Sequence, residues 1–395
     1  MSPGQPGPGP AQPAAQTARR AARGIARCVF AVSAATAGSN AALADPALGL
    51  PPRAALSRIE LVRAELGRQL FFDRRLSFNG TMSCGMCHVP EEGFASNASQ
   101  QAVGIEGRSL RRNTPTVLNV AWMSDLFLDG REHSLVTQAW SPLLHPDEMA
   151  NPSPGHLLAR LRGMADYAGR FERAFGGRSA SMDTLGEALA AYQRTLVAGD
   201  SRFDRWRYGG QSQALDAQER RGFALFTGKA RCALCHLVGD SYAHLTDQRY
   251  HVTGAGAAWQ ARTSIEVPLA PGVNTTLSVT DREAYDRAPV HDLGRWEITL
   301  DPRDRYAFRT PSLRNVARTG PYMHDGSLPT LEAVVDFYTR GGGPAPDRSP
   351  LLVPIALDAS ERQALTAFMR ALDSQALPAL IRRARSPYAS GAAVR

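Results

Sequence analysis

The chain has 395 residues, a length typical of two or three domains that can bury a sizeable core, and its 43% hydrophobic and 7% aromatic content is ordinary for a globular protein. The formal net charge is +8, but residues 1–44 hold four arginines and no acidic residue, which leaves 41 basic against 37 acidic side chains in the remainder. So mild an excess, with no basic cluster interleaved with aromatic residues, argues against a nucleic-acid partner.

The N-terminal segment has the order of a secretory signal that follows a disordered start. Residues 2–16 are rich in Pro, Gly, Ala and Gln, a composition typical of disorder. A basic stretch, Arg19–Arg27, precedes a short apolar run, Cys28–Val32, and Ala42–Ala44 has the A-x-A form of a cleavage site. The apolar run is too short to span a bilayer. We therefore predict that residues 1–44 are removed on export, together with their single cysteine; a disordered tail on a cytosolic protein is the alternative.

Two Cys-x-x-Cys-His pentads are the strongest signal in the chain. The first gives Cys84, Cys87 and His88, and the second gives Cys232, Cys235 and His236. This spacing is the signature of covalent c-type haem attachment, in which the cysteines form thioethers with the porphyrin and the histidine is an axial ligand to the iron. A redox dithiol or a zinc site is the alternative, but a Cys2His zinc site needs a fourth ligand, and no further Cys-x-x-Cys supplies one. Because bacteria attach haem to this motif outside the cytoplasm, the pentads and the signal together predict two haem c groups and a periplasmic location.

Helical periodicity and helix-start residues mark most of the remaining elements. Helices are predicted over Leu66–Phe72, Leu157–Phe175, Leu185–Leu196, Arg221–Phe226, 330–340 and 359–373. Strand signals are few and short, around Arg249–Val252 and Trp296–Leu300. Segments of similar form, ending in Leu-Phe, precede each pentad, so the chain looks duplicated. The predicted fold class is mostly α, with two cytochrome c-like haem domains, few short strands and long loops.

Changes in composition divide the chain into four parts. Gly209–Ser212 interrupts the pattern and indicates a boundary near residues 205–215. The predicted parts are a signal segment (1–44), an N-terminal haem domain (45–208), a C-terminal haem domain (209–373) and a tail (374–395). Within the C-terminal domain, residues 253–290 lack periodicity and are predicted to be a surface excursion. The tail is rich in Arg and Ala and is expected to fray.

Short sequence blocks keep a fixed order around the two pentads. In the first half they are Leu70–Asp73, Arg112–Asn119, Asp129–Arg131, Gln138–Ala139 and Pro146–Met149, and in the second half they are Asp292–Arg295, Tyr306–Val316 and Pro321–Ser327. In this order, from about Leu66 to Tyr338, the chain resembles the bacterial di-haem cytochrome c peroxidases and, within them, the MauG-like branch. The resemblance implies that the N-terminal haem is the peroxidatic one, with an open sixth position. It also implies that the C-terminal haem is six-coordinate and transfers electrons.

The resemblance assigns Gln138, Pro142 and Glu148 to the distal pocket of the first haem. Peroxide cleavage needs a group that moves a proton between two oxygens, which Glu148 can do, while Gln138 can hydrogen-bond the bound oxygen. From the local pattern alone, Glu148 would be a surface carboxylate at a helix start. In the peroxidase branch, a His in the loop after the first pentad often blocks the resting site, but Val89–Arg108 contains no His. This favours the MauG-like branch, with the site open at rest.

The sixth ligand of the second haem distinguishes the branches of the family. The peroxidases have a Met there, whereas the equivalent position here is Tyr338, a MauG-like feature. A phenolate favours the oxidised iron, so Tyr338 is expected to lower the reduction potential of this haem. Alternatively, Tyr338 is ordinary helix packing, and Met323 or His324 is the ligand.

The family also implies a calcium ion between the haems, bound by oxygen ligands. The matching positions are the side chain of Asn113 and the main-chain carbonyls of Thr319 and Pro321. No acidic cluster supports these positions in the sequence, so a water-rich site is expected. Alternatively, Asn113 caps a turn before Pro115.

Two positions depart from the family pattern. A Trp that lies between the haems in the family is Leu128 here, and the surface Trp two residues before the second pentad of MauG is Ala230. Either Trp122, Trp140 or Phe127 substitutes as a relay, or electrons pass directly between the haem edges. Both Trp residues also fit simple core positions. These departures weigh against the oxidation of a partner protein by hole hopping.

The leading hypothesis is a periplasmic di-haem c-type oxidoreductase, a cytochrome c peroxidase or MauG-like enzyme, that reacts with hydrogen peroxide at the N-terminal haem. The expected partners are hydrogen peroxide and either a small periplasmic redox protein (a cytochrome c or a cupredoxin) or a target protein that is oxidised, and a homodimer is compatible with the family. The first alternative is a non-catalytic di-haem electron-transfer cytochrome c, which predicts two six-coordinate haems and no reaction with peroxide. The second is a cytosolic zinc protein.

Overall fold

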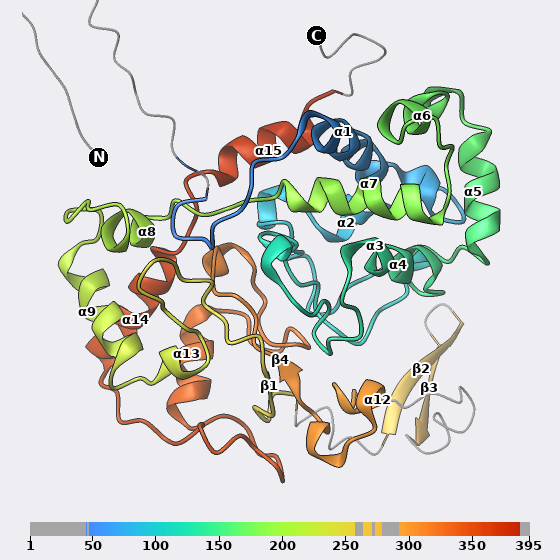
Figure 1. Ribbon diagram of the computed structural model, residues 1–395. Coiled ribbons are helices and arrows are strands. Elements are labelled where there is room, and N and C mark those ends of the chain that lie inside the picture. Colours follow the sequence, from blue (N-terminus) through green and yellow to red (C-terminus); the bar gives the residue numbers. More distant parts are fainter. Residues whose placement is uncertain (1–44, 46, 257–263, 271–272, 279–291, 388–395) are drawn as a thin grey trace, which may run out of the picture. The chain divides into compact units, whose positions relative to one another are not determined.

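The structure is a computed structural model that describes residues 45, 47–256, 264–270, 273–278 and 292–387 (Figure 1). Helices dominate these residues, and the strands among them form two antiparallel pairs, β1 (Tyr250–His251) with β4 (Phe308–Arg309) and β2 (Ser264–Ala270) with β3 (Val273–Ser278). The prediction of a mostly α chain with few short strands is confirmed. In the described ranges, no helix combines the length and the apolar character needed to cross a bilayer. The predicted signal segment, with Cys28, lies outside them.

The first half is built on two helices that pack closely, α1 (Arg58–Phe72) and α7 (Met182–Arg194). α1 begins with a capping box at Ser57, which satisfies main-chain amides that the first turn would otherwise leave unpaired. The helices approach each other at Gly67, where a Cβ would lie 1.8 Å from the carbonyl oxygen of Ala188. A larger residue at this position would force the two helices apart.

The second half has a matching pair of helices, α9 (Ala217–Thr227) and α14 (Ala359–Arg370). Each begins with a capping box formed by an Asp and a Glu. Gly222 is the point of approach, because a Cβ there would lie 2.0 Å from the carbonyl oxygen of Ala364. The same device therefore brings the two helices together in each half.

Shorter elements connect and cover these helix pairs. In the first half they are α2 (Cys84–Cys87), α3 (Leu135–Gln138), α4 (Trp140–Leu144), α5 (Pro154–Arg162) and α6 (Arg170–Ala174). In the second half they are α8 (Arg202–Arg207), α12 (Trp296–Thr299), α13 (Leu331–Thr339) and α15 (Leu377–Arg385). Figure 1 shows α7 running beside α1, and α13 lying with α14 and α9.

Two large apolar cores lie beneath these helices, with a third, small cluster formed by Leu126, Leu135 and Ala190. Residues 66–198 contribute most of the first core, and residues 203–372 contribute the second. The change from one core to the other thus falls just before α8. The exception is α15, which follows the second core in sequence but buries Leu377 in the first.

The C-terminal segment differs from its prediction. Residues after 374 were expected to fray, but the structure contains α15 there. Its apolar residues pack on the first core, and Arg68 donates from Nη1 to the carbonyl oxygens of Arg383 (3.1 Å) and Ser386 (2.7 Å). A local reading of the sequence could not find these contacts, because their partners lie more than 300 residues away.

Three other segments also differ in detail. Residues 296–300, predicted as a strand, form α12, in which the amide of Leu300 donates to the carbonyl of Trp296 at 2.9 Å. The single helix predicted over Leu157–Phe175 is divided into α5 and α6, because Gly163 ends the first and Gly169 adopts a φ of +70° before the second. The segment 253–290, which lacks periodicity, contains the β2–β3 pair.

Candidate functional site

The first pentad lies on α2, and its histidine follows directly. The Nδ1 atom of His88 lies 3.1 Å from the carbonyl oxygen of Phe94, and the ring packs beside Phe71. Because a carbonyl can only accept, Nδ1 carries the proton, which leaves the Nε2 lone pair free for a metal. Burial lowers the pKa of His88 to about 4, so the imidazole is neutral, as metal ligation requires.

The second pentad has the same proximal geometry. Cys232–Leu234 form a short 3-10 turn, and Nδ1 of His236 lies 2.9 Å from the carbonyl oxygen of Leu245. Phe226 packs beside the His236 ring, with centroids 6.4 Å apart and 44° between the planes, against 6.1 Å and 43° for the matching pair in the first half. Burial also lowers the pKa of His236. Both histidines are therefore oriented as axial ligands by a main-chain carbonyl.

The four pentad cysteines are partly buried, and their thiols are protonated. Burial raises the pKa of Cys84 and Cys232 to about 12, and that of Cys87 and Cys235 to about 11. Zinc sites and reactive dithiols need stabilised thiolates, so these surroundings disfavour both alternatives. They suit thiols that are consumed in thioether bonds.

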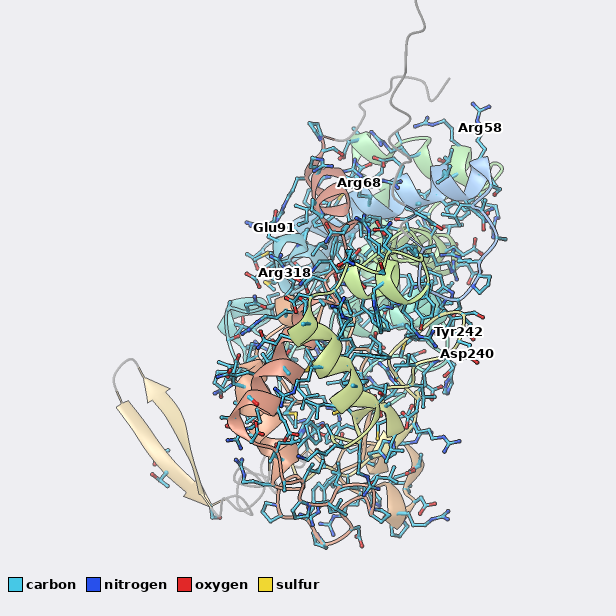
Figure 2. All side chains as sticks on the ribbon, turned by 90° about the vertical axis from the view of Figure 1, so that its left-hand side faces the viewer. Arg58, Arg68, Glu91, Asp240, Tyr242 and Arg318 are labelled. Atoms are coloured by element: carbon cyan, nitrogen blue, oxygen red, sulfur yellow. The ribbon has the colours of Figure 1, made fainter. Side chains whose placement is uncertain are left out.

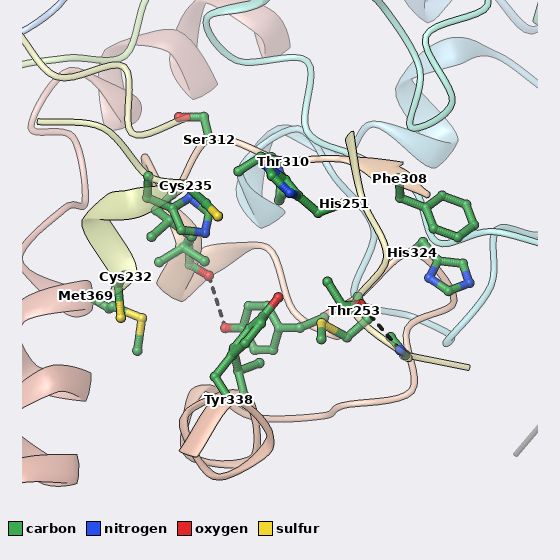
Figure 3. Close-up of a pocket in the computed structure, with 18 of the residues that line it drawn as sticks. Cys232, Cys235, His251, Thr253, Phe308, Thr310, Ser312, His324, Tyr338 and Met369 are labelled. Carbon is green, nitrogen blue, oxygen red and sulfur yellow. Dashed lines mark hydrogen bonds between the residues drawn. The ribbon is translucent and has the colours of Figure 1, made fainter. Parts of the chain in front are cut away.

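A cavity lies over the second pentad and receives Tyr338 from α13 (Figure 3). Cys232, Cys235 and His236 line this cavity. The hydroxyl of Thr330 caps α13, which places Tyr338 two turns along the helix. Burial raises the pKa of Tyr338 above its ordinary value, and the two cysteines of the pentad add to this effect. The phenol therefore shares the cavity with the second pentad.

The two alternative ligands of the second haem, Met323 and His324, line the same cavity. The ring of His324 stacks on Phe308, with centroids 3.8 Å apart and 11° between the planes. In Figure 3, His324 and Cys235 lie on opposite sides of the view. The charged groups that act on His324 are Asp325, Asp292 and Arg112, not the pentad. This placement favours Tyr338 over His324.

The cavity has the chemistry for a large, flat, mostly apolar group with polar atoms. Its apolar lining includes Leu118, Val120, Leu128, Leu313, Val334 and Leu365. Within the described part of the chain, two buried atoms of the lining, His244 Nε2 and Thr114 Oγ1, have no hydrogen-bond partner. Buried polar atoms are rarely left unpaired, so these atoms indicate that the cavity accepts a group with polar atoms of its own. The residues present therefore fit a covalently held porphyrin.

Gln138, Pro142 and Glu148 follow one another along α3, α4 and the turn after α4. Main-chain hydrogen bonds fix this turn: the amide of Glu148 donates to the carbonyl of His145 (3.1 Å), and its carbonyl accepts from the amide of Ile105 (3.0 Å). Burial is the main cause that raises the pKa of Glu148. Its charge in turn helps to raise the pKa of both cysteines of the first pentad. The Glu148 carboxyl therefore acts on the first pentad, where the resemblance places it.

The three positions expected to bind calcium lie around one cavity. Asn113, Thr319 and Pro321 all line it, although about 200 residues separate the first from the other two. The Asn113 side chain is oriented by a hydrogen bond from Nδ2 to the carbonyl of Gln100 (2.9 Å). The fold thus brings together the side-chain amide and the two carbonyl-bearing residues.

Among the aromatic residues considered as a relay, Trp122 touches the second half of the molecule. Its ring packs edge-on against His244, with centroids 6.5 Å apart and 68° between the planes. Trp140 is buried in the first core and donates from Nε1 to a main-chain carbonyl, which confirms its prediction as a core residue. Phe127 lies under an arginine guanidinium, 3.4 Å from its ring centroid. Leu128 lines the cavity.

Matching hydroxyl groups hold the loops that carry the two proximal carbonyls. Thr116 donates from Oγ1 to the carbonyl of Gly93 (2.6 Å), and Ser312 donates from Oγ to the carbonyl of His244 (2.7 Å). In each half, the accepting residue directly precedes the one whose carbonyl orients the axial histidine. The two loops are therefore fixed in the same way.

A buried ion pair holds the second loop more firmly. Arg314 and Asp204 are at most 2% exposed and pair at 2.7 Å, and Arg314 Nε donates to the carbonyl of Ala243 (2.8 Å). Arg314 Nη2 also donates to the carbonyl of Gly49. The position that corresponds to Arg314 in the first half is Leu118, two residues after Thr116 as Arg314 is two after Ser312. The ion pair therefore has no charged counterpart at that position.

Sequence reasoning did not identify Asp204, His244 or Arg314 as functional, nor Arg309, which lines the cavity with His244. The two arginines lie inside the block Tyr306–Val316, and that membership was the available signal. Nothing in the local pattern distinguished Asp204 or His244.

Comparisons with known sequences agree with this geometry. A family profile described as di-haem cytochrome c peroxidase matches residues 62–213. The chain is 40% identical over 320 residues to the methylamine utilization protein MauG of Methylorubrum extorquens, covering 79% of this chain and 78% of that protein. It is 38% identical over 362 residues to the cytochrome-c peroxidase IdrP1 of Pseudomonas sp. strain SCT, covering 87% of this chain and 89% of that protein.

Two solved structures have a similar fold. A MauG-like protein associated with microbial copper homeostasis superposes with a TM-score of 0.65 at 33% identity, over 83% of this chain and 94% of that one. The diheme peroxidase BthA of Burkholderia thailandensis E264 superposes with a TM-score of 0.64 at 27% identity, over 89% and 93%.

Proposed function

This chain belongs to the di-haem cytochrome c peroxidase family and is a di-haem peroxidase-type oxidoreductase, and on that premise we propose how its two pentads divide the work. Hydrogen peroxide reacts at the haem of the first pentad, and the haem of the second pentad transfers electrons. One observation carries this proposal. The pentads share their proximal geometry, but Glu148 acts on the first and Tyr338 shares the cavity of the second. An acid–base group beside one iron and a ligand beside the other support an open site and a closed site.

Bound haem iron supplies the redox chemistry, in which two electrons and two protons convert hydrogen peroxide to two waters. Glu148 takes the proton from the oxygen that binds and returns it to the oxygen that leaves. Burial raises the pKa of Glu148, which makes its protonated form more accessible than that of an exposed carboxyl. Gln138 donates a hydrogen bond to the bound oxygen, and Pro142 limits the space for water beside it.

Tyr338 is the sixth ligand of the second haem in this proposal. The support is its position in the cavity with Cys232, Cys235 and His236, and the effect of both thiols on its pKa. An oxygen ligand favours the oxidised iron and keeps peroxide away from it.

The two halves are a duplicated pair of haem domains in this proposal, with residues 45–208 and 209–373 as their ranges. The matching helix pairs, the two apolar cores and the two carbonyl-oriented histidines support this division. The helix α15, which packs on the first core, lies in the predicted tail (374–395).

A calcium ion between the haems is a further part of the proposal. Asn113 provides its side-chain oxygen, and Thr319 and Pro321 provide main-chain carbonyls, with water completing the shell. The support is their common position around the cavity.

We place the enzyme in the periplasm because haem is attached to such pentads outside the cytoplasm. Its substrate is hydrogen peroxide. The second partner is either a small periplasmic redox protein, a cytochrome c or a cupredoxin, or a target protein that is oxidised. A homodimer is compatible with these roles.

The test is the electron paramagnetic resonance spectrum of the oxidised holoprotein, followed by addition of peroxide without prior reduction. One high-spin and one low-spin haem, with rapid spectral change on peroxide addition, are expected. Two low-spin haems that do not react with peroxide would instead identify a non-catalytic electron-transfer cytochrome and overturn the proposal.

A further inference from the structure

Arg309 carries a buried guanidinium that lacks a carboxylate partner. The side chain belongs to β4 and the residue is 9% exposed. Nε donates to the carbonyl of Phe127 (3.2 Å), while Nη1 contacts the sulfur of Met123 (3.8 Å) and the carbonyl of Thr310 (3.5 Å). In the described part of the chain, no carboxylate lies within 4.0 Å of this guanidinium, and Nη2 makes no hydrogen bond. A buried charge without a counter-ion is strongly unfavourable, so the position indicates an anion that the polypeptide itself does not provide.

His244 presents a second unsatisfied polar atom in the same cavity. It is 8% exposed, and Nε2 has no hydrogen-bond partner among the described residues. Burial lowers the pKa of His244 to about 4, and the charges of Arg314 and Arg309 add to this effect, so the ring is neutral. Ser312 holds the main-chain carbonyl of His244, and the Trp122 ring packs against its imidazole. The ring is therefore held in place with one hydrogen-bonding atom unused.

The two residues belong to the surroundings of the second pentad. Both line the cavity that also contains Cys232, Cys235 and His236. Arg309 contacts Met123, the neighbour of Trp122, whose ring packs against His244. Arg314 is different, because Asp204 pairs with it fully. A haem carries two propionate carboxylates on one edge of an otherwise apolar ring. A guanidinium and an imidazole N–H are the partners that such carboxylates prefer in a buried site.

We propose that Arg309 and His244 bind the propionate carboxylates of the haem attached at Cys232 and Cys235. This inference rests on the proposed haem at the second pentad, but not on which haem reacts with peroxide. Because the amide of Arg309 also donates to the carbonyl of Leu128 (2.8 Å), the same residue fixes the segment of the first half that faces the second. Arg309 would thus bind a propionate and hold that segment of the first half in place at the same time.

The positive charge of Arg309 is present only in the second half at this position of the block. The block Arg309-Thr310-Pro311 in the second half matches Asn113-Thr114-Pro115 in the first, so an amide stands where the second half has a guanidinium. A positive charge beside a haem favours the reduced iron. Arg309 therefore opposes the effect of Tyr338 and raises the reduction potential of the second haem above the value that a tyrosine ligand alone would give.

The test is a spectroelectrochemical titration of the holoprotein, with both haems attached, that follows each haem separately. Arg309→Gln is expected to lower the midpoint potential of the haem attached at Cys232 and Cys235 and to leave that of the other haem nearly unchanged. Arg309→Lys, which keeps the charge, should shift it less. Arg303→Gln is the matched control, because it removes the same charge from an exposed position, and it should shift neither haem. Equal shifts in both haems, no shift in either, or the same shift in the control would overturn the proposal.

A second measurement keeps the proposal testable if Arg309→Gln does not fold. The propionate bending bands in the resonance Raman spectrum should shift in His244→Phe, which removes the hydrogen bond but keeps a flat ring in place. Bands identical to those of the wild type would overturn the role of His244. The spectroscopic test of the proposed function is independent of these two measurements. If it showed two low-spin haems in the wild type, the Raman and potential shifts would still be expected.

Discussion

The two halves hold their axial histidines in the same way but surround them differently. In each half, a carbonyl orients Nδ1, a phenylalanine packs beside the ring and a hydroxyl fixes the loop. Beyond this shared set, Glu148 acts on the first pentad, whereas Tyr338, Arg309 and the Asp204–Arg314 pair surround the second. The shared set suits haem attachment at both pentads, and the differences support the separate roles proposed for them.

Figure 2 shows how many charged side chains lie on the outside of the molecule, among them Arg58, Glu91, Asp240 and Arg318. These exposed charges differ from the buried charges of the second half in how much they contribute to stability. Exposed ion pairs contribute about 0–1 kcal/mol, whereas removal of one partner of a buried pair is far more destabilising. Buried charges, rather than exposed ones, are therefore able to distinguish the two haems.

The largest expected effect concerns Glu148, the acid–base group proposed for the first pentad. Glu148→Gln removes the acid–base function, so the rate of reaction with peroxide should fall by about 10²–10⁴-fold. Stopped-flow absorbance of the oxidised holoprotein measures this rate. Glu332→Gln is the control, because it makes the same exchange at an exposed carboxyl of the second half and should leave the rate unchanged. An unchanged rate in Glu148→Gln would remove the main difference between the halves.

The next effect concerns stability of the second half. Asp204→Ala leaves the buried Arg314 without its partner, and the free energy of unfolding should fall by about 3–5 kcal/mol. Chemical denaturation of the holoprotein measures the loss. Asp240→Ala, which breaks an exposed pair with Arg207, should produce no measurable loss. Equal stability of the two variants would show that the buried pair does not hold the second loop.

Substitution of the two close-approach glycines compares the halves directly. Gly67→Ala and Gly222→Ala each place a methyl group against a facing carbonyl, and each should reduce the free energy of unfolding by about 1–3 kcal/mol. Gly155→Ala is the control, since its nearest neighbour would be 3.8 Å away. Thermal denaturation provides the comparison. If one half tolerated the change and the other did not, the likeness of the helix pairs would be superficial.

The ligand of the second haem gives a smaller, spectroscopic effect. Tyr338→Met replaces an oxygen with a thioether, so the midpoint potential of the second haem should rise and its absorption spectrum should change. Tyr322→Phe is the matched control, because Tyr322 lines the same cavity but donates its hydroxyl to the carbonyl of Val316. A spectrum of Tyr338→Met identical to that of the wild type would place the ligand elsewhere.

The smallest effect is expected from removal of calcium. Chelation should slow electron exchange between the haems, because the proposed ion lies between the halves and orders the segments that carry Asn113 and Pro321. Flash reduction of one haem measures this exchange. Asn113→Ala should exchange slowly without chelator and respond no further to it. Indifference of the wild type to chelation would argue against the metal site.

Much of the site was predictable from the sequence because its signals are local. The spacing of Cys84, Cys87 and His88 is contained in five residues. Gln138 and Glu148 were instead predicted from the family resemblance, because the local pattern alone makes Glu148 a surface carboxylate. The helices α7, α13 and α14 follow their apolar periodicity and their capping residues closely. The helix prediction was wrong over residues 157–175, where glycines divide a periodic stretch into two helices. It also missed α15, a helix that packs on the distant first core.

The sequence by itself predicted two attached haems and the residues that attach them, and it determined the family to which the chain belongs. The tertiary structure decided what surrounds each haem. Arg309 meets Phe127 across 182 positions, and Arg314 meets Asp204 across 110. Such contacts depend on how the chain folds back on itself, and no local spacing records them. An arginine becomes a buried charge only when the fold removes water from around it, so its role was visible only in the folded molecule.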